Sequence, residues 1–185
     1  MTNLILVRHG QSIWNKEKRF TGWMDVDLTE KGESEAKLAG QLIKELDIEF
    51  HTCFTSCLRR AEKSLKIILE VIDKKNIEII KSEALNERHY GGLTSLNKEE
   101  TIKKYGDKQV EIWRRSYDVP PPNGESLKMT YERSVPYYKD VICSNFKNSN
   151  IIISAHGNSI RAIIKYLFNY SNSEILKTFA ILSIY

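Results

Sequence analysis

Short apolar runs alternate along this chain with longer stretches in which apolar residues recur at helical spacing. The apolar runs lie at residues 4–7, 53–55, 77–80 and 151–155, and each has the length of a buried strand. The longer stretches predict helices over residues 29–46, with Thr29 as the N-cap, over 58–72, over 126–146, and from a cap at Asn158 or Ser159 onward. Pro136 predicts a kink in the third helix, or else marks its true start.

The pattern is weaker between residues 84 and 123, where charged and aromatic residues are frequent. Short helices are predicted there at 98–105 and 108–115, followed by a proline-rich loop at 120–124. Strands that alternate with helices of about ten or more residues predict an α/β fold, with a doubly wound, mainly parallel sheet and helices on both faces. No repeat or linker interrupts the pattern, so we expect a single domain over residues 1–185.

Two of the predicted strands end in a histidine followed by a glycine, in Arg8-His9-Gly10 and in Ala155-His156-Gly157. Ligands of such sheets bind beyond the carboxyl ends of the strands. If the two strands are neighbours, both histidines face the same pocket.

Composition places the chain among ordinary globular proteins, with 41% hydrophobic and 28% charged residues. No apolar run approaches the roughly 18 residues that span a bilayer, and no signal peptide is recognisable, so we expect a cytoplasmic protein without a membrane partner. The net charge of +4 comes from lysines that alternate with acids, which argues against a nucleic-acid-binding stripe. Cys53, Cys57 and Cys143 are expected to be reduced, buried thiols rather than metal ligands with His51.

His9 is the candidate nucleophile, because a neutral imidazole can attack phosphorus while flanking cations stabilise the phosphoryl oxygens. The alternative is that His9 only forms structural hydrogen bonds at the end of its strand. His156 is able to donate a hydrogen bond to the same oxygens, or else is only a turn residue at a helix start.

Several arginines lie where a pocket would form, and guanidinium groups match phosphate and carboxylate bidentately. They are Arg8, Arg59, Arg60, Arg88, Arg114 and Arg115. Arg60 opens a predicted helix, so its side chain and the helix N-terminus both favour an anion. Each arginine is alternatively a surface ion pair, and for Arg59 we adopt that interpretation. Glu87 lies beside Arg88 and His89, where it is a candidate proton acceptor, or else an ion-pair partner of Arg88.

Most of these residues belong to runs that together resemble the cofactor-dependent phosphoglycerate mutases of the histidine phosphatase superfamily. The runs are Leu6-Val7-Arg8-His9-Gly10, Trp14-Asn15, Arg19-Phe20-Thr21-Gly22-Trp23, residues 85–93, Tyr105-Gly106-Asp107, Trp113-Arg114-Arg115 and Ala155-His156-Gly157-Asn158-Ser159. The resemblance extends from Leu4 to Leu176. Arg-His-Gly marks the superfamily, whereas Glu-Arg-His-Tyr-Gly-Gly-Leu and Trp-Arg-Arg point to the mutase branch.

The resemblance implies roles for individual residues. His9 would carry the phosphoryl group, Glu87 would transfer the proton, and His156, Arg8 and Arg60 would complete the catalytic set. The substrate-binding residues would be Arg8, Gly10, Gln11, Ser12, Asn15, Thr21, Gly22, Arg60, Glu87, Arg88, His89, Tyr90, Lys98, Arg114, Arg115, Gly157 and Asn158. The implied reaction interconverts 2-phosphoglycerate and 3-phosphoglycerate in glycolysis and gluconeogenesis, with 2,3-bisphosphoglycerate as primer and no metal. The implied partner is a small anionic substrate, and the sequence leaves open whether two chains form a homodimer.

The chain departs from the family's pattern near its end, where residues 178–185 stand in place of a Pro-Thr-Gly turn, a further strand and a tail over the pocket. We therefore expect easier access of water to phosphorylated His9, and a sheet edge that is unpaired or covered by residues 180–185. Two alternatives follow: a phosphatase of the same superfamily, or an inactive, shortened relative that only binds anions.

Overall fold

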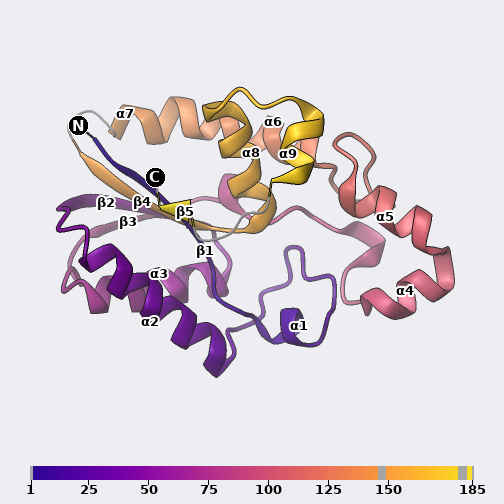
Figure 1. The fold of residues 1–185 in the computed structure, drawn as a ribbon, viewed down its shortest axis with the longest axis horizontal. Coiled ribbons are helices and arrows are strands. Elements are labelled where there is room, and N and C mark those ends of the chain that lie inside the picture. The colour runs from indigo at the N-terminus through magenta and orange to yellow at the C-terminus, as the bar shows by residue number, and fades with distance from the viewer. Residues whose placement is uncertain (1, 146–148, 179–182, 185) are drawn as a thin grey trace.

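A five-stranded sheet forms the centre of the computed structural model, which describes residues 2–145, 149–178 and 183–184 (Figure 1). The strands are β1 (Leu4–Arg8), β2 (Phe50–Thr55), β3 (Glu78–Lys81), β4 (Asn150–Ala155) and β5 (Ser183–Ile184), in the order β3-β2-β4-β1-β5. The first four are parallel to their neighbours, and β5 is antiparallel to β1. The predicted mainly parallel sheet is confirmed.

Helices cover both faces of this sheet, as predicted (Figure 1). The helices are α1 (Ile13–Lys16), α2 (Glu30–Lys44), α3 (Arg59–Val71), α4 (Lys98–Tyr105), α5 (Asp107–Arg115), α6 (Leu127–Tyr137), α7 (Cys143–Asn145), α8 (Gly157–Leu167) and α9 (Asn172–Lys177). α2 and α3 pack on one face, and α6, α8 and α9 pack on the other. α4 and α5 lie beyond the ends of the strands, on the side where the loops after β1 and β4 emerge.

The two faces bury separate hydrophobic clusters, which fix the register of the strands. On the face of α2 and α3, Ile5 and Val7 of β1 share a buried cluster with Ile43 and Leu65. On the other face, Leu6 and Ile153 share a cluster with Ile163 of α8. Because side chains alternate along a strand, β1 contributes to both clusters from consecutive residues. Burial on both faces explains why its sequence is a continuous apolar run.

Two helix predictions needed correction. The first concerns the single helix predicted over 126–146. The helix begins at Leu127, so Pro136 does not mark its start. After Tyr137 the helix changes to a π-helical turn over Tyr138–Ile142. Pro136 has no N–H that could form a hydrogen bond within the helix. Just after it, the backbone hydrogen bonds take the wider, π-helical spacing. The predicted end at Phe146 lies outside the described residues. The second concerns the start of α8, where the N-cap is His156 and not Asn158 or Ser159. Both of the predicted caps lie inside the first turn of the helix, and the Ser159 hydroxyl accepts from the His156 N–H at 3.2 Å.

The cysteines are free, but they are not equally buried. Cys53 lies in the core against β4, Cys143 is half-buried and Cys57 is exposed, so the prediction of buried thiols is confirmed for Cys53, met in part by Cys143 and wrong for Cys57. Most of the segment 178–185 lies outside the described residues, yet Ser183 and Ile184 pair with Leu6 and Ile5. Among the described residues, no helix combines the length and apolar character that crossing a membrane requires.

Candidate active site

His9 and His156 meet at the carboxyl ends of adjacent parallel strands. Arg8 of β1 is in register with Ala155 of β4, and the His9 N–H donates to the Ala155 carbonyl at 3.1 Å. The two imidazole ring centroids are 4.9 Å apart. The two strands are neighbours, as the expectation of a shared pocket required, but within the described residues only His9 lines the cavity described below, whereas His156 is fully buried beside it.

The turn after β1 requires glycine because it presses against the first turn of α2. A Cβ atom on Gly10 would lie 2.1 Å from the Gly32 carbonyl oxygen, and a Cβ atom on Gly32 would lie 2.2 Å from that of Gln11. Real side chains do not tolerate such distances. The Gly10 N–H also donates to the Ser64 hydroxyl of α3 at 3.1 Å, so two helices hold the backbone beside His9.

The surroundings of His9 leave it neutral, with its Nε2 unprotonated. Its Nδ1 lies 2.6 Å from the Gly10 carbonyl oxygen, which can only accept, so Nδ1 carries the proton. Nε2 then bears the lone pair and accepts from Arg60 Nε at 3.3 Å. Burial lowers the pKa of His9 well below 6.5, and the charges of Arg60 and Arg8 lower it further. Nε2 is therefore an unprotonated nucleophile at neutral pH.

Arg60 is fixed on three sides at the start of α3. Besides bonding His9, its terminal nitrogens donate to the carbonyls of Met24 at 2.8 Å and Gly22 at 2.7 Å. Its side chain is 1% exposed, and burial lowers its pKa to about 10, so it stays cationic at neutral pH. A guanidinium held in this way cannot swing aside when charge develops next to His9.

One carboxylate oxygen of Glu87 is fixed, which leaves the other for chemistry. Oε1 accepts from the Arg88 N–H at 2.7 Å, from the Asn158 amide side chain at 2.8 Å and from the Asn158 N–H at 3.2 Å. Within the described part of the chain, Oε2 has no hydrogen-bond partner and no ion pair joins Glu87 to Arg88. The ion-pair interpretation of Glu87 is therefore not the one that the structure adopts.

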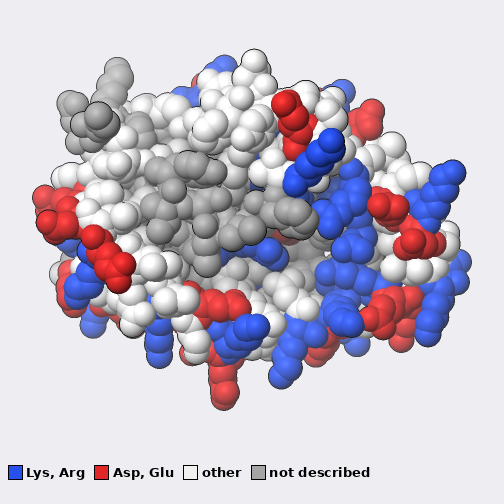
Figure 2. Space-filling view, viewed as in Figure 1, with Lys and Arg blue, Asp and Glu red and all other residues white. Residues whose placement is uncertain are grey.

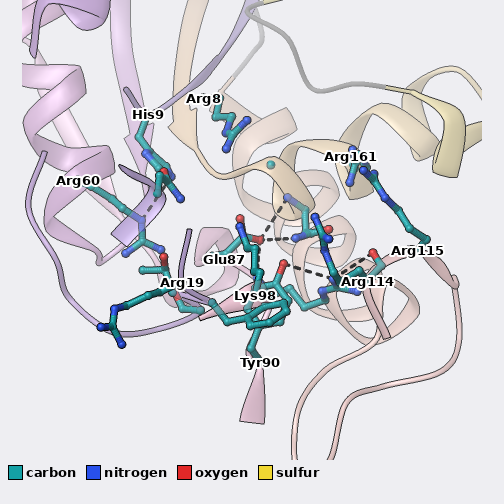
Figure 3. A pocket seen from close by; sticks show the side chains of 17 residues that line it. Arg8, His9, Arg19, Arg60, Glu87, Tyr90, Lys98, Arg114, Arg115 and Arg161 are labelled. Atoms are coloured by element: carbon teal, nitrogen blue, oxygen red, sulfur yellow. Dashed lines mark hydrogen bonds between the residues drawn. The ribbon is translucent and has the colours of Figure 1, made fainter. Parts of the chain in front are cut away.

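A cavity of about 320 Å³ opens in front of these groups. Its lining contains eight cationic side chains and one carboxylate, that of Glu87. In Figure 3, His9 and Arg60 lie on one side of Glu87, and Arg114, Arg115 and Arg161 lie on the other. Figure 2 shows lysine and arginine side chains gathered beside a hollow between α1 and α5. Such a cavity suits an anion with charge at both ends.

Most of the residues expected to bind substrate line this cavity. They are Arg8, Asn15, Thr21, Gly22, Arg60, Glu87, Arg88, Tyr90, Lys98, Arg114, Arg115, Gly157 and Asn158. Lys98 lies over the Phe20 ring, and burial lowers its pKa.

Four of the expected binding residues lie outside the lining. Gly10 and Gln11 instead line a second cavity of about 400 Å³ that shares Arg8, His9 and Asn15 with the first. Ser12 is buried and caps α1 by accepting from the Asn15 N–H at 3.2 Å. His89 faces away, with its ring 5.9 Å from that of Trp23 and its N–H donating to Glu125. These four residues support the loops that carry the lining.

The structure adds Arg19, Phe20 and Arg161 to the lining, none of which the sequence analysis selected for binding. Arg161 follows Asn158 by three residues on α8, and residues at this spacing share a helix face. That spacing was the available signal. Arg59, by contrast, forms an exposed ion pair with Asp25 at 3.7 Å, as expected.

Three buried polar atoms in and beside the cavity have no partner within the described residues: Thr21 Oγ1, Arg88 Nε and His156 Nδ1. Buried polar atoms are nearly always hydrogen-bonded, and an unpaired one costs about 1–3 kcal/mol. Thr21 and Arg88 line the cavity and the His156 ring lies beside that of His9, so these atoms are candidates to bind a polar ligand.

Comparisons with known proteins identify the family of the chain. The model of the histidine phosphatase superfamily (branch 1) matches residues 4–181. A 2,3-bisphosphoglycerate-dependent phosphoglycerate mutase of Parvibaculum lavamentivorans is 51% identical over 174 residues, which are 94% of this chain and 83% of the relative. A phosphoglycerate mutase of Schizosaccharomyces pombe is 53% identical over 175 residues, with the same coverage.

Solved structures share the fold at lower identity. Bacillus stearothermophilus YhfR superimposes with a TM-score of 0.84 at 23% identity, over 96% of this chain and 85% of that one. A mycobacterial glucosyl-3-phosphoglycerate phosphatase gives a TM-score of 0.82 at 22% identity, over 96% of this chain and 86% of that one.

Proposed function

The chain belongs to the histidine phosphatase superfamily, and on that premise we propose that it is a 2,3-bisphosphoglycerate-dependent phosphoglycerate mutase, an isomerase of glycolysis and gluconeogenesis. One observation carries the proposal from the structure. A neutral imidazole with an unprotonated Nε2 and a carboxylate with a free oxygen line the same cation-rich cavity. Relatives that are about half identical over most of the chain carry the mutase name, which favours this activity over simple hydrolysis.

The proposed reaction begins with His9 phosphorylated at Nε2. The free hydroxyl of phosphoglycerate attacks phosphorus, the bond from Nε2 to phosphorus breaks, and a bond from oxygen to phosphorus forms. Glu87 takes the hydroxyl proton on Oε2, because its other oxygen is held by Asn158 and the Arg88 N–H. The electron pair of the broken bond returns to Nε2, where Arg60 Nε donates a hydrogen bond.

The second half reverses these roles. The doubly phosphorylated product turns over, and Nε2 of His9 attacks its other phosphate while Glu87 returns the proton to the leaving oxygen. Arg8 and Arg60 stabilise the charge on the phosphoryl oxygens during both transfers. Arg114, Arg115 and Lys98 hold the remote end of the molecule, with Thr21 and Arg88 supplying their unpartnered polar atoms.

The same residues fit 2,3-bisphosphoglycerate as the primer that phosphorylates the resting enzyme. It carries one phosphate for His9 and another that needs cations at a distance, and the lining provides cations on both sides of Glu87. No step of this scheme needs a metal ion. The free thiols and the metabolic role favour a cytoplasmic setting.

A direct test compares isomerisation with phosphate release. With bisphosphoglycerate present, we expect conversion of 3-phosphoglycerate into 2-phosphoglycerate to exceed release of inorganic phosphate, and acid-labile phosphate to appear on His9. Release that equals or exceeds isomerisation would favour the phosphatase alternative. The absence of any label on His9 would leave only the anion-binding relative. His9→Gln is the matched control, because it must lose the label without losing the cavity.

A further inference from the structure

Ser56 is buried in the loop between β2 and α3, and the proposed chemistry assigns it no role. Its hydroxyl oxygen lies 2.7 Å from Nε2 of His156. Ser56 is fully buried, as is His156, so water does not compete for this contact. A hydroxyl can donate to an imidazole nitrogen or accept from it, and each direction puts the His156 proton on a different nitrogen.

The contacts of Ser56 decide the direction. The Leu58 N–H already donates to the Ser56 oxygen at 3.2 Å, and the hydroxyl hydrogen still needs an acceptor. Within the described residues, His156 Nε2 is the acceptor that the hydroxyl contacts. If Nε2 carried the proton instead, the Ser56 hydrogen and the His156 Nδ1 lone pair would both be buried without partners. With Nε2 as the acceptor of the Ser56 hydrogen, only the Nδ1–H group of His156 is left unpaired, so this arrangement is the more stable.

We propose that Ser56 is a positioning residue that holds His156 as the tautomer with its proton on Nδ1. Nδ1 is the buried nitrogen that lacks a partner, on a ring whose centroid is 4.9 Å from that of His9. With Nε2 engaged by Ser56, Nδ1–H is the donor left to a phosphoryl oxygen on His9. The role in phosphoryl transfer rests on the proposed function, whereas the tautomer itself does not.

This assignment explains how His156 assists without carrying a charge. Burial lowers the pKa of His156 well below 6.5, and the charges of Arg60, Arg8 and Arg133 add to that effect. A neutral ring is a donor through one nitrogen alone, so the identity of the protonated nitrogen decides whether it binds or repels a phosphoryl oxygen. With the other tautomer, a lone pair would face the anion.

The tautomer can be read in the resting protein by nitrogen NMR. In protein labelled with ¹⁵N at histidine, we expect His156, assigned by comparison with His156→Gln, to show a protonated Nδ1 and an unprotonated Nε2 at neutral pH. Ser56→Ala should shift this pattern toward the other tautomer, and Ser56→Thr should restore it. A wild-type spectrum with the proton on Nε2 would overturn the inference, whatever the variants do.

The kinetic consequence is measured as the rate at which bisphosphoglycerate phosphorylates His9. We expect Ser56→Ala to slow it by about 10- to 100-fold, the range known for groups that orient metal-bound histidines, and Ser56→Thr to recover most of the rate. Ser154→Ala is the matched control, since it also removes a buried serine hydrogen bond, from Oγ to the Ala61 carbonyl at 2.9 Å.

The outcomes separate the two proposals. Equal slowing in Ser154→Ala and Ser56→Ala, with an unchanged His156 spectrum in both, would make Ser56 merely structural and overturn the inference. Wild-type protein that never becomes phosphorylated would refute the proposed function, while its His156 spectrum would still decide the tautomer.

Discussion

At the scale of single residues, burial sets the charge of the two histidines and so the chemistry of the site. His9 and His156 are 7% and 0% exposed, and each lies close to Arg8 and Arg60. Protonation of either ring would place a further positive charge among these guanidinium groups. The histidines therefore stay neutral in the folded protein under conditions where an exposed histidine begins to titrate.

This charge state predicts how stability depends on pH. In the unfolded chain both histidines bind a proton near pH 6.5, whereas in the folded chain their pKa values are lower. As pH falls below that value, the unfolded state takes up protons first, so the free energy of unfolding decreases, with a slope approaching about 1.4 kcal/mol per pH unit for each histidine. Urea titrations between about pH 8 and about pH 5.5 measure this slope. His9→Gln should reduce it, and an unchanged slope would contradict the assignment.

Arg161 predicts a separate effect on substrate binding. It lines the cavity, its Nε donates to the Thr178 carbonyl at 2.9 Å, and burial and Arg115 lower its pKa. Two neighbouring guanidinium groups repel each other until an anion lies between them. We expect Arg161→Gln to raise KM for phosphoglycerate by about tenfold, the cost of one charge-assisted hydrogen bond.

Arg59→Gln is the control for Arg161→Gln in steady-state kinetics. It removes the same charge from an exposed ion pair with Asp25 outside the cavity lining, so its KM should stay close to that of the wild type. If both variants raise KM equally, overall charge rather than contact with the substrate is responsible.

Residue types and local spacing selected His9, Arg60 and Glu87, which line the cavity, and His156, whose ring lies beside that of His9. Arg161 was missed because only the helix geometry of α8 brings it to the same cavity as Asn158. The resemblance also implied Gln11 and Ser12, yet the turn points them toward Thr29 and α1. Proximity in sequence says little about direction once a chain turns sharply.

At the scale of elements, α6 holds the loop that carries Glu87. Arg133 of α6 donates to the carbonyls of Glu83 at 2.8 Å, Ala84 at 2.9 Å and Asn86 at 3.3 Å, and forms an ion pair with Glu125 at 3.0 Å. Glu125 in turn accepts from the His89 N–H at 2.9 Å. Since irregular segments have few backbone hydrogen bonds of their own, these contacts determine where Glu87 lies.

Replacement of Arg133 by methionine should therefore loosen this loop and leave Glu125 as an unpaired, mostly buried charge. We expect a loss of about 3 kcal/mol in the free energy of unfolding and a fall in isomerisation of at least about tenfold. Urea unfolding and steady-state assays measure the two effects. Lys128→Met, in an exposed pair with Glu132 on the same helix, should change neither appreciably. Activity that survives in Arg133→Met would show that Glu87 is held by other contacts.

The elements were predicted well where their patterns are local and less well where packing or backbone chemistry intervenes. α4 has the predicted bounds, and Thr29 caps α2 as expected. The π-helical turn after Pro136 could not be foreseen, because hydrophobic periodicity does not distinguish a wide turn from an ordinary one. A histidine cap at α8 is likewise unusual, since Ser, Thr, Asp and Asn are preferred there.

At the scale of the whole molecule, much of the positive charge is gathered in one cavity although the net charge is only +4. Binding of a polyanion there should stabilise the fold, by about 2.7 kcal/mol at a hundredfold excess over Kd. We expect bisphosphoglycerate to raise Tm, inorganic phosphate to raise it less, and sodium chloride to weaken both effects through screening. Glycerol, which lacks phosphate, is the control, and an equal shift with glycerol would show that the cavity is not the cause.

The parallel pairing of β1 with β4 joins two segments from opposite ends of the sequence, which meet in register at Arg8 and Ala155. Each segment delivers one of the two imidazoles, so neither half of the polypeptide contains a complete reaction centre. Cleavage in the exposed stretch after Asp118 would yield two fragments that are inert alone. Recovered turnover on mixing such fragments would report that the central strands had found each other, making activity a readout of assembly.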